Sequence, residues 1–110
     1  MSNADAGEAV PALIFAALGD QTRLALLTRL GGGAQSITSL SAGTSFTRQG
    51  VTKHLRVLER AGLVRALRHG RESRFEIAPG RIEEARSYLD RVAQQWDDAL
   101  ARLKALVETN

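Results

Sequence analysis

Apolar side chains recur every three or four residues over much of the chain, which is the spacing of one face of an α-helix. In the first third, this spacing predicts a helix over about 8–18 and a second helix, which Asp20 caps and which ends at glycines 31–33. Residues 1–7 are small and polar, so we expect a flexible N-terminus there.

The middle of the chain carries two further helix-start signals in close succession. Ser36 predicts the start of a short helix that ends near Gly43. Thr47 predicts the start of a longer helix over 48–61, which Gly62 stops. A short helix, a tight turn and a longer helix are together typical of a helix-turn-helix.

The period of the apolar pattern changes after this helix. Residues 63–68 and 73–77 are short, partly alternating segments on either side of residues 69–72, a pattern that predicts a β-hairpin. The pattern as a whole predicts one mainly helical domain with a small β-hairpin, over about 8–108.

A seven-residue repeat dominates the C-terminal part, within a helix predicted over about 81–107. The apolar positions of this seam are Ile82, Ala85, Leu89, Val92, Trp96, Ala99, Leu103 and Leu106. Soluble monomers rarely leave such a stripe exposed, so the seam predicts a dimer interface. A small-molecule effector pocket beside Trp96 is the alternative role for that residue.

The helix predicted over 48–61 has two different faces. At 100° per residue, Val51, Leu55 and Leu58 share one face, and the opposite face is basic and polar. Such polar side chains reach phosphates and base edges in the major groove of DNA. The residues predicted to do so are Thr47, Arg48, Gln49, Thr52, Lys53 and Arg56. A merely solvated face is the competing interpretation. His54 lies near the apolar arc, where we expect a packed or hydrogen-bonded side chain rather than a DNA contact.

Positive charge is concentrated in this helix and the hairpin. Residues 47–74 contain eight basic and two acidic residues, a net charge of +6, whereas the whole chain has a net charge of +3. A basic segment on an acidic remainder indicates a polyanionic partner. The hairpin residues predicted to contact phosphate backbone or the minor groove are Arg68, His69, Arg71 and Arg74. The alternative is that these charges only prevent the edge of the sheet from pairing with another strand.

The composition excludes several classes of site. The 110 residues include no cysteine and two histidines, which excludes a disulfide scaffold and a thiolate metal site. No nucleophile–base arrangement is visible either, so we predict no enzyme activity, no metal and no other cofactor. No apolar run approaches the ~20 residues of a membrane span, so we expect a cytoplasmic protein without a membrane partner.

Three motifs, in this order, resemble the ArsR-type (arsenical-resistance-repressor) winged-helix regulators. FAALGDQTRLALL at 15–27 is similar to their opening ALGDPTRLxIL, and TRQGVTKHLRVLERAGLV at 47–64 is similar to their recognition helix SxxxVSxHLxxLxxAGLV. RHGRE at 68–72 matches their hairpin motif RxGRxxxY, with Phe75 in place of the tyrosine. The resemblance covers about 8–107 and implies a winged helix-turn-helix in a homodimeric, DNA-binding repressor.

The resemblance also implies that the first and last helices form the dimer interface. The interface residues expected are Leu13, Ile82, Ala85, Leu89, Val92, Trp96 and Leu103. The chain departs from the metal-sensing members, because its third helix has no cysteine and its last helix no histidine, so we expect no zinc or arsenite sensing. The function expected is sequence-specific repression of transcription at double-stranded operator DNA. The alternative is a winged-helix module that binds an acidic protein.

Overall fold

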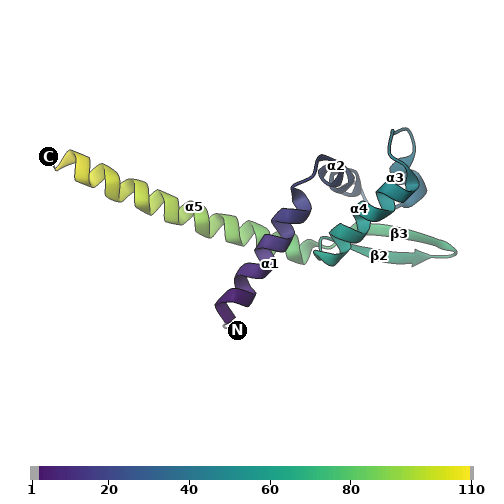
Figure 1. Ribbon diagram of the computed structural model, residues 1–110, viewed down its shortest axis with the longest axis horizontal. Helices are drawn as coiled ribbons and strands as arrows, with labels where there is room; N and C mark the ends of the chain where they lie inside the picture. The colour runs from purple at the N-terminus through teal and green to yellow at the C-terminus, as the bar shows by residue number, and fades with distance from the viewer. Residues whose placement is uncertain (1–2, 110) are drawn as a thin grey trace.

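The computed structural model describes the backbone of residues 3–109 and the side chains of residues 11–109. In chain order the elements are α1 (Asn3–Leu18), α2 (Gln21–Leu30), β1 (Gln35–Ser36), α3 (Ile37–Ser41), α4 (Arg48–Arg60), β2 (Val64–His69), β3 (Glu72–Ile77) and α5 (Pro79–Glu108). In Figure 1 the hairpin of β2 and β3 projects to one side of the helical body, and α5 extends to the other side with α1 crossing its first part. The predicted order of helices and hairpin is confirmed.

Two helices begin earlier than the sequence pattern predicted. α1 begins at Asn3, so residues 3–7 of the predicted flexible N-terminus are helical, whereas residues 1–2 lie outside the described residues. This segment is rich in alanine, which has the highest helix propensity. α5 begins at Pro79 rather than Arg81. Proline fits the first turn of a helix, because the N–H groups there have no acceptor within the helix and the N–H that proline lacks is not needed.

The sheet has a third strand that the sequence did not predict. β1 pairs antiparallel with β3 through Gln35 and Phe75 and through Ser36 and Arg74, and β2 pairs with the other edge of β3. A strand of two residues is too short to show an alternating pattern. Because α3 begins directly after β1, this pairing places the start of α3 beside the hairpin.

The three predicted helix caps are confirmed. The side-chain oxygens of Asp20, Ser36 and Thr47 each accept a hydrogen bond of 3.0 Å from the backbone N–H three residues further on. Each bond satisfies one of the free N–H groups of a first helical turn. The bond from the backbone N–H of Arg23 lowers the pKa of Asp20, and the positive guanidinium of the same residue acts in the same direction.

One hydrophobic core holds α4 in place. Leu26, Leu40, Leu55, Leu58 and Leu63, from α2, α3, α4 and the chain after α4, are fully buried. Burial of a leucine side chain contributes about 1.5–3 kcal/mol. The apolar face of α4 is therefore anchored over its whole length, which leaves the opposite face free to present its polar side chains.

Substitution of Gly62 by alanine is expected to destabilise the domain. Gly62 ends α4 with a φ of +77°, and a Cβ there would lie 2.6 Å from Cγ of Arg81. A left-handed conformation costs a non-glycine residue about 1–2 kcal/mol, and the Arg81 side chain must also move. Urea unfolding of Gly62→Ala should show this loss, whereas the control Gly80→Ala, where a Cβ meets nothing within 4 Å, should not be destabilised. Equal midpoints for the two variants would contradict the prediction.

Candidate nucleic-acid interface

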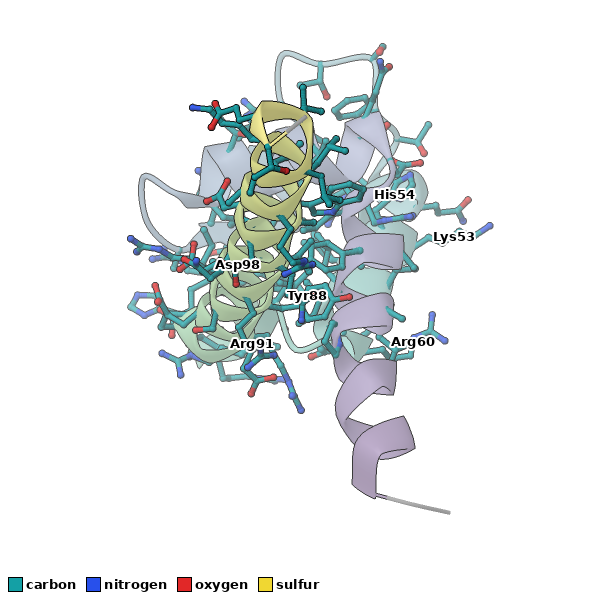
Figure 2. All side chains as sticks on the ribbon, turned by 90° about the vertical axis from the view of Figure 1, so that its left-hand side faces the viewer. Lys53, His54, Arg60, Tyr88, Arg91 and Asp98 are labelled. Carbon is teal, nitrogen blue, oxygen red and sulfur yellow. The ribbon has the colours of Figure 1, made fainter. Side chains whose placement is uncertain are left out.

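The exposed face of α4 carries the polar and basic residues that the sequence pattern indicated. Val51, Leu55 and Leu58 occupy the buried face. On the other face Thr52 is half-buried, and the exposed residues are Thr47, Arg48, Gln49, Lys53 and Arg56. Figure 2 shows Lys53 and Arg60 extending away from the body on the same side of the molecule. The helix therefore presents a continuous donor-rich surface to solvent.

Two hydrogen bonds within α4 use donor groups of its polar face, so these groups are less available to a ligand. The Thr52 hydroxyl donates to the carbonyl oxygen of Arg48 at 2.8 Å, so its lone pairs and its methyl group are what it offers to a ligand. Nη1 of Arg56 donates to Oε1 of Glu59 at 3.1 Å. Arg56 is therefore partly neutralised in the free protein, whereas Arg48 and Lys53 are ion-paired with no acidic group among the described side chains.

His54 takes part in a set of polar contacts that connects α4 with the end of α1 and the start of α2. Its Nδ1 lies 3.4 Å from Nη1 of Arg23 and 4.0 Å from Oδ1 of Asp20. The Arg23 side chain also donates to the carbonyl oxygens of Ala17, at 2.5 Å, and of Ala16, at 3.2 Å. The hydrogen-bonded His54 expected from the sequence is thus confirmed. Arg23 connects the end of α1 and the start of α2 with α4, a role that no sequence pattern indicated.

The hairpin carries its basic residues at and behind the tip. Arg68, His69 and Arg71 are exposed, and Gly70 takes a φ of +63° in the turn. Arg74 is half-buried, with its Nε 3.5 Å from Oε2 of Glu72. The structure therefore leaves three of the four predicted hairpin residues fully available at the tip, and it engages the fourth in an ion pair.

A hollow of about 470 Å³ lies between the helix-turn-helix and the hairpin. Arg48 of α4 and Arg71 of the hairpin both line it, with Thr38 of α3 and with Glu72 and Ser73 of β3. We refer to it as the α3–hairpin hollow. The structure thus brings together two predicted contact residues that are 23 positions apart. Thr38 and Ser73 were missed, because only the unpredicted pairing of β1 with β3 places them side by side.

The described part of the chain shows no group of three or more histidine, cysteine, aspartate or glutamate side chains that could hold a metal ion. Within the same residues, no helix combines the length and the apolar character needed to cross a membrane. The exposed surface of residues 11–109 carries basic and acidic side chains together with several large apolar ones.

The predicted interface residues fall into two groups. Ala85, which the sequence assigned to the dimer seam, is only 6% exposed and belongs to the core of its own chain, because α1 crosses α5 at this level. Its side chain is therefore mostly covered within its own chain, and little of it is left for a partner. The Phe15 and Tyr88 rings, 5.8 Å apart, mark the same crossing, and Figure 2 shows Tyr88 with Arg91 near it on α5.

The remaining interface residues line an outer, uncovered stripe. Val92 is half-buried, and the exposed residues are Leu13, Ile82, Leu89, Trp96 and Leu103. Leu100 and Val107, which the strict seven-residue repeat omits, widen the stripe. α5 has 30 residues and is therefore about 45 Å long, so most of its apolar face lies beyond the body of the domain.

Known proteins share this architecture. A family model for a helix-turn-helix domain matches residues 18–66, which include α2, α3 and α4. The HTH-type transcriptional regulator Rv2034 of Mycobacterium tuberculosis is 30% identical over 99 residues, with 90% of each chain covered.

Solved structures agree with that match. An ArsR-like transcriptional regulator from Rhodococcus sp. RHA1 is 37% identical, with a TM-score of 0.82 over 90% of this chain and 93% of that chain. A homodimeric winged helix-turn-helix DNA-binding domain from Mycobacterium bovis, 23% identical, has a TM-score of 0.70 over 86% of this chain and 88% of that domain. The chain therefore belongs to the ArsR-type winged helix-turn-helix transcriptional regulators, which are DNA-binding proteins and not enzymes.

Proposed function

We propose that this protein is a homodimeric repressor that binds a specific operator sequence and blocks access to promoter DNA. The observation that carries the proposal is the combination of the exposed polar face of α4 with the arginine-rich hairpin tip. In this arrangement α4 enters the major groove and the hairpin contacts the flanking backbone or minor groove. The contact residues proposed are Thr47, Arg48, Gln49, Thr52, Lys53, Arg56, Arg68, His69, Arg71 and Arg74.

Selection from a random duplex library tests this function directly. The protein should enrich one pseudo-palindromic sequence, with half-sites about one helical turn apart, as a two-fold symmetric dimer requires. Its affinity should fall steeply as salt rises. Repression is tested by transcription in vitro from a promoter that contains the selected site. Failure to enrich any sequence would favour the alternative, a module that binds an acidic protein.

The dimer proposal rests on the exposed apolar stripe of α5. Leu89, Trp96 and Leu103 are each more than half exposed in the single chain, which soluble monomers rarely tolerate over so long a stretch. The similar domain from Mycobacterium bovis is homodimeric. We infer that a second copy of this chain covers the stripe, with Leu13 of α1 at its edge.

Gln49 is proposed to read a base. It lies in the first turn of α4, exposed, and its amide can form two hydrogen bonds with adenine. Gln49→Ala should cost about 1–3 kcal/mol on the selected operator and relax the preference at one base pair per half-site, as measured by fluorescence anisotropy with variant duplexes. Equal weakening on specific and random DNA would show that Gln49 contacts the backbone instead.

DNA binding is proposed to be independent of metal ions. The chain offers neither cysteine nor a histidine on α5, and carboxylates alone make poor transition-metal sites. Operator affinity should therefore be the same after dialysis against a strong chelator and after addition of zinc. A reversible loss of binding with zinc, absent with magnesium at equal ionic strength, would contradict this expectation.

A further inference from the structure

The α3–hairpin hollow lies between the two elements that are proposed to enter the grooves of DNA. A single sugar–phosphate strand separates a major groove from the adjacent minor groove. A protein that places α4 in the major groove and a hairpin tip in the minor groove therefore straddles that strand. The space between the two elements then faces backbone rather than bases.

The side chains that line the hollow suit a phosphate group. Arg48 and Arg71 reach it from different elements, and the exposed Thr38 and Ser73 add hydroxyl groups. Guanidinium donors match phosphate oxygens in geometry, and their hydrogen bonds to an anion are stronger than neutral ones. The Ser36 hydroxyl is already used as the cap of α3, so it contributes less.

Glu72 is the acidic residue in this lining. Its Oε2 lies 3.5 Å from Nε of Arg74, and its side chain is 48% exposed, so the pair with Arg74 neutralises it in part. A phosphate in the hollow would still be repelled by the remaining charge. Removal of that charge should consequently strengthen binding.

We propose that the α3–hairpin hollow binds one phosphate of the operator backbone in each half-site, held by Arg48 on one side and Arg71 on the other. Thr38 and Ser73 complete the site with hydroxyl contacts. The proposal rests on the proposed DNA-binding function and adds a specific consequence. Because the two arginines share a ligand, docking of the hairpin and docking of α4 on the duplex are coupled events.

A scan with neutral methylphosphonate linkages tests the shared phosphate. On unmodified operator, Arg48→Gln and Arg71→Gln should each lower the affinity at least about 100-fold, because each substitution removes one charge-assisted hydrogen bond in both half-sites. On a duplex neutralised at one particular phosphate per half-site, both substitutions should lose their effect. The modified phosphate at which the effect disappears must be the same for both variants.

The dependence of affinity on salt gives a second, independent measure. The slope of log K against log[salt] counts neutralised phosphates, at about 0.9 for each. The double variant should therefore lower the slope by about 2 per dimer, since one phosphate is lost in each half-site. If each arginine instead contacted its own phosphate, the dimer would lose four contacts and the slope would fall by about 4.

Matched substitutions separate the hollow from general effects on charge and stability. Thr38→Val should weaken operator binding, whereas Thr28→Val, at an exposed position of α2 outside the hollow, should not. Glu72→Gln should strengthen binding several-fold, and Glu83→Gln on α5 should leave it unchanged.

Different sensitive positions for the two arginine variants would overturn the proposal. The proposal would also be overturned if both variants kept their full loss of affinity on every methylphosphonate duplex. That result is expected if the hollow holds a free phosphate ion. Wild-type protein that binds no duplex at all would overturn the proposed function itself, so the two failures are distinguishable.

Discussion

Replacement of Trp96 and Leu103 by glutamate is expected to produce a folded monomer that binds operator DNA at least about 100-fold more weakly than the wild type. These side chains are 64% and 57% exposed in the single chain, so its own core does not depend on them. In the proposed dimer they lie in the apolar seam, where a buried unpaired carboxylate is strongly unfavourable. The substitutions therefore act on assembly rather than on folding.

The loss of DNA affinity follows from the loss of linkage between two half-site contacts. Once one protomer of a dimer is bound, the second meets its half-site at a high effective concentration, which raises the overall affinity by about 10²–10⁴. Sedimentation velocity measures the mass of the Trp96→Glu/Leu103→Glu variant, circular dichroism its helix content, and fluorescence anisotropy its operator affinity.

A control on the same helix makes the dimer experiment specific. Ser87→Glu/Ala101→Glu adds the same two charges at exposed positions well away from the stripe, and it should remain dimeric with wild-type operator affinity. A wild-type protein that sediments as a monomer at micromolar concentration would contradict the dimer. A Trp96→Glu/Leu103→Glu variant that stays dimeric would show that the interface lies elsewhere.

Local signals in the sequence were sufficient to predict the helix-turn-helix. The caps at Asp20, Ser36 and Thr47 depend on hydrogen bonds to residues three positions away, so each can be recognised within one turn of chain. The two faces of α4 follow from its apolar period alone, and Val51 and Leu55 are buried as that period predicts. The proposed contact residues on α4 depend on the same period.

Features that depend on pairing between distant segments could not be predicted. β1 is two residues long and exists because β3 offers a free edge, so nothing within Gln35 and Ser36 identifies it. The α3–hairpin hollow depends on that pairing and was missed with it. Ala85 fits the seven-residue repeat as well as Leu89 does, but only the crossing of α1 over α5 decides that Ala85 is covered within its own chain.

Reversal of two charges on α4 is expected to abolish specific DNA binding. Lys53 and Arg56 lie on the exposed face, and the pair between Arg56 and Glu59 is largely solvated, so Lys53→Glu/Arg56→Glu should cost about 1 kcal/mol of stability at most. If each side chain contacts one phosphate, the dimer loses four contacts. The slope of log K against log[salt] should then fall by about 3–4, and the affinity at 0.1 M salt should fall at least about 100-fold.

A second pair of reversals distinguishes a local contact from the effect of net charge. Arg86→Glu/Lys104→Glu on α5 changes the net charge of the chain by the same amount, at exposed positions on a different helix. Long-range repulsion from DNA is screened beyond the Debye length of about 10 Å at 0.1 M salt, so this control should retain most of the affinity. Equal losses in the two variants, each verified as a folded dimer, would show that α4 does not face the duplex. The recognition surface would then have to lie on another part of the domain.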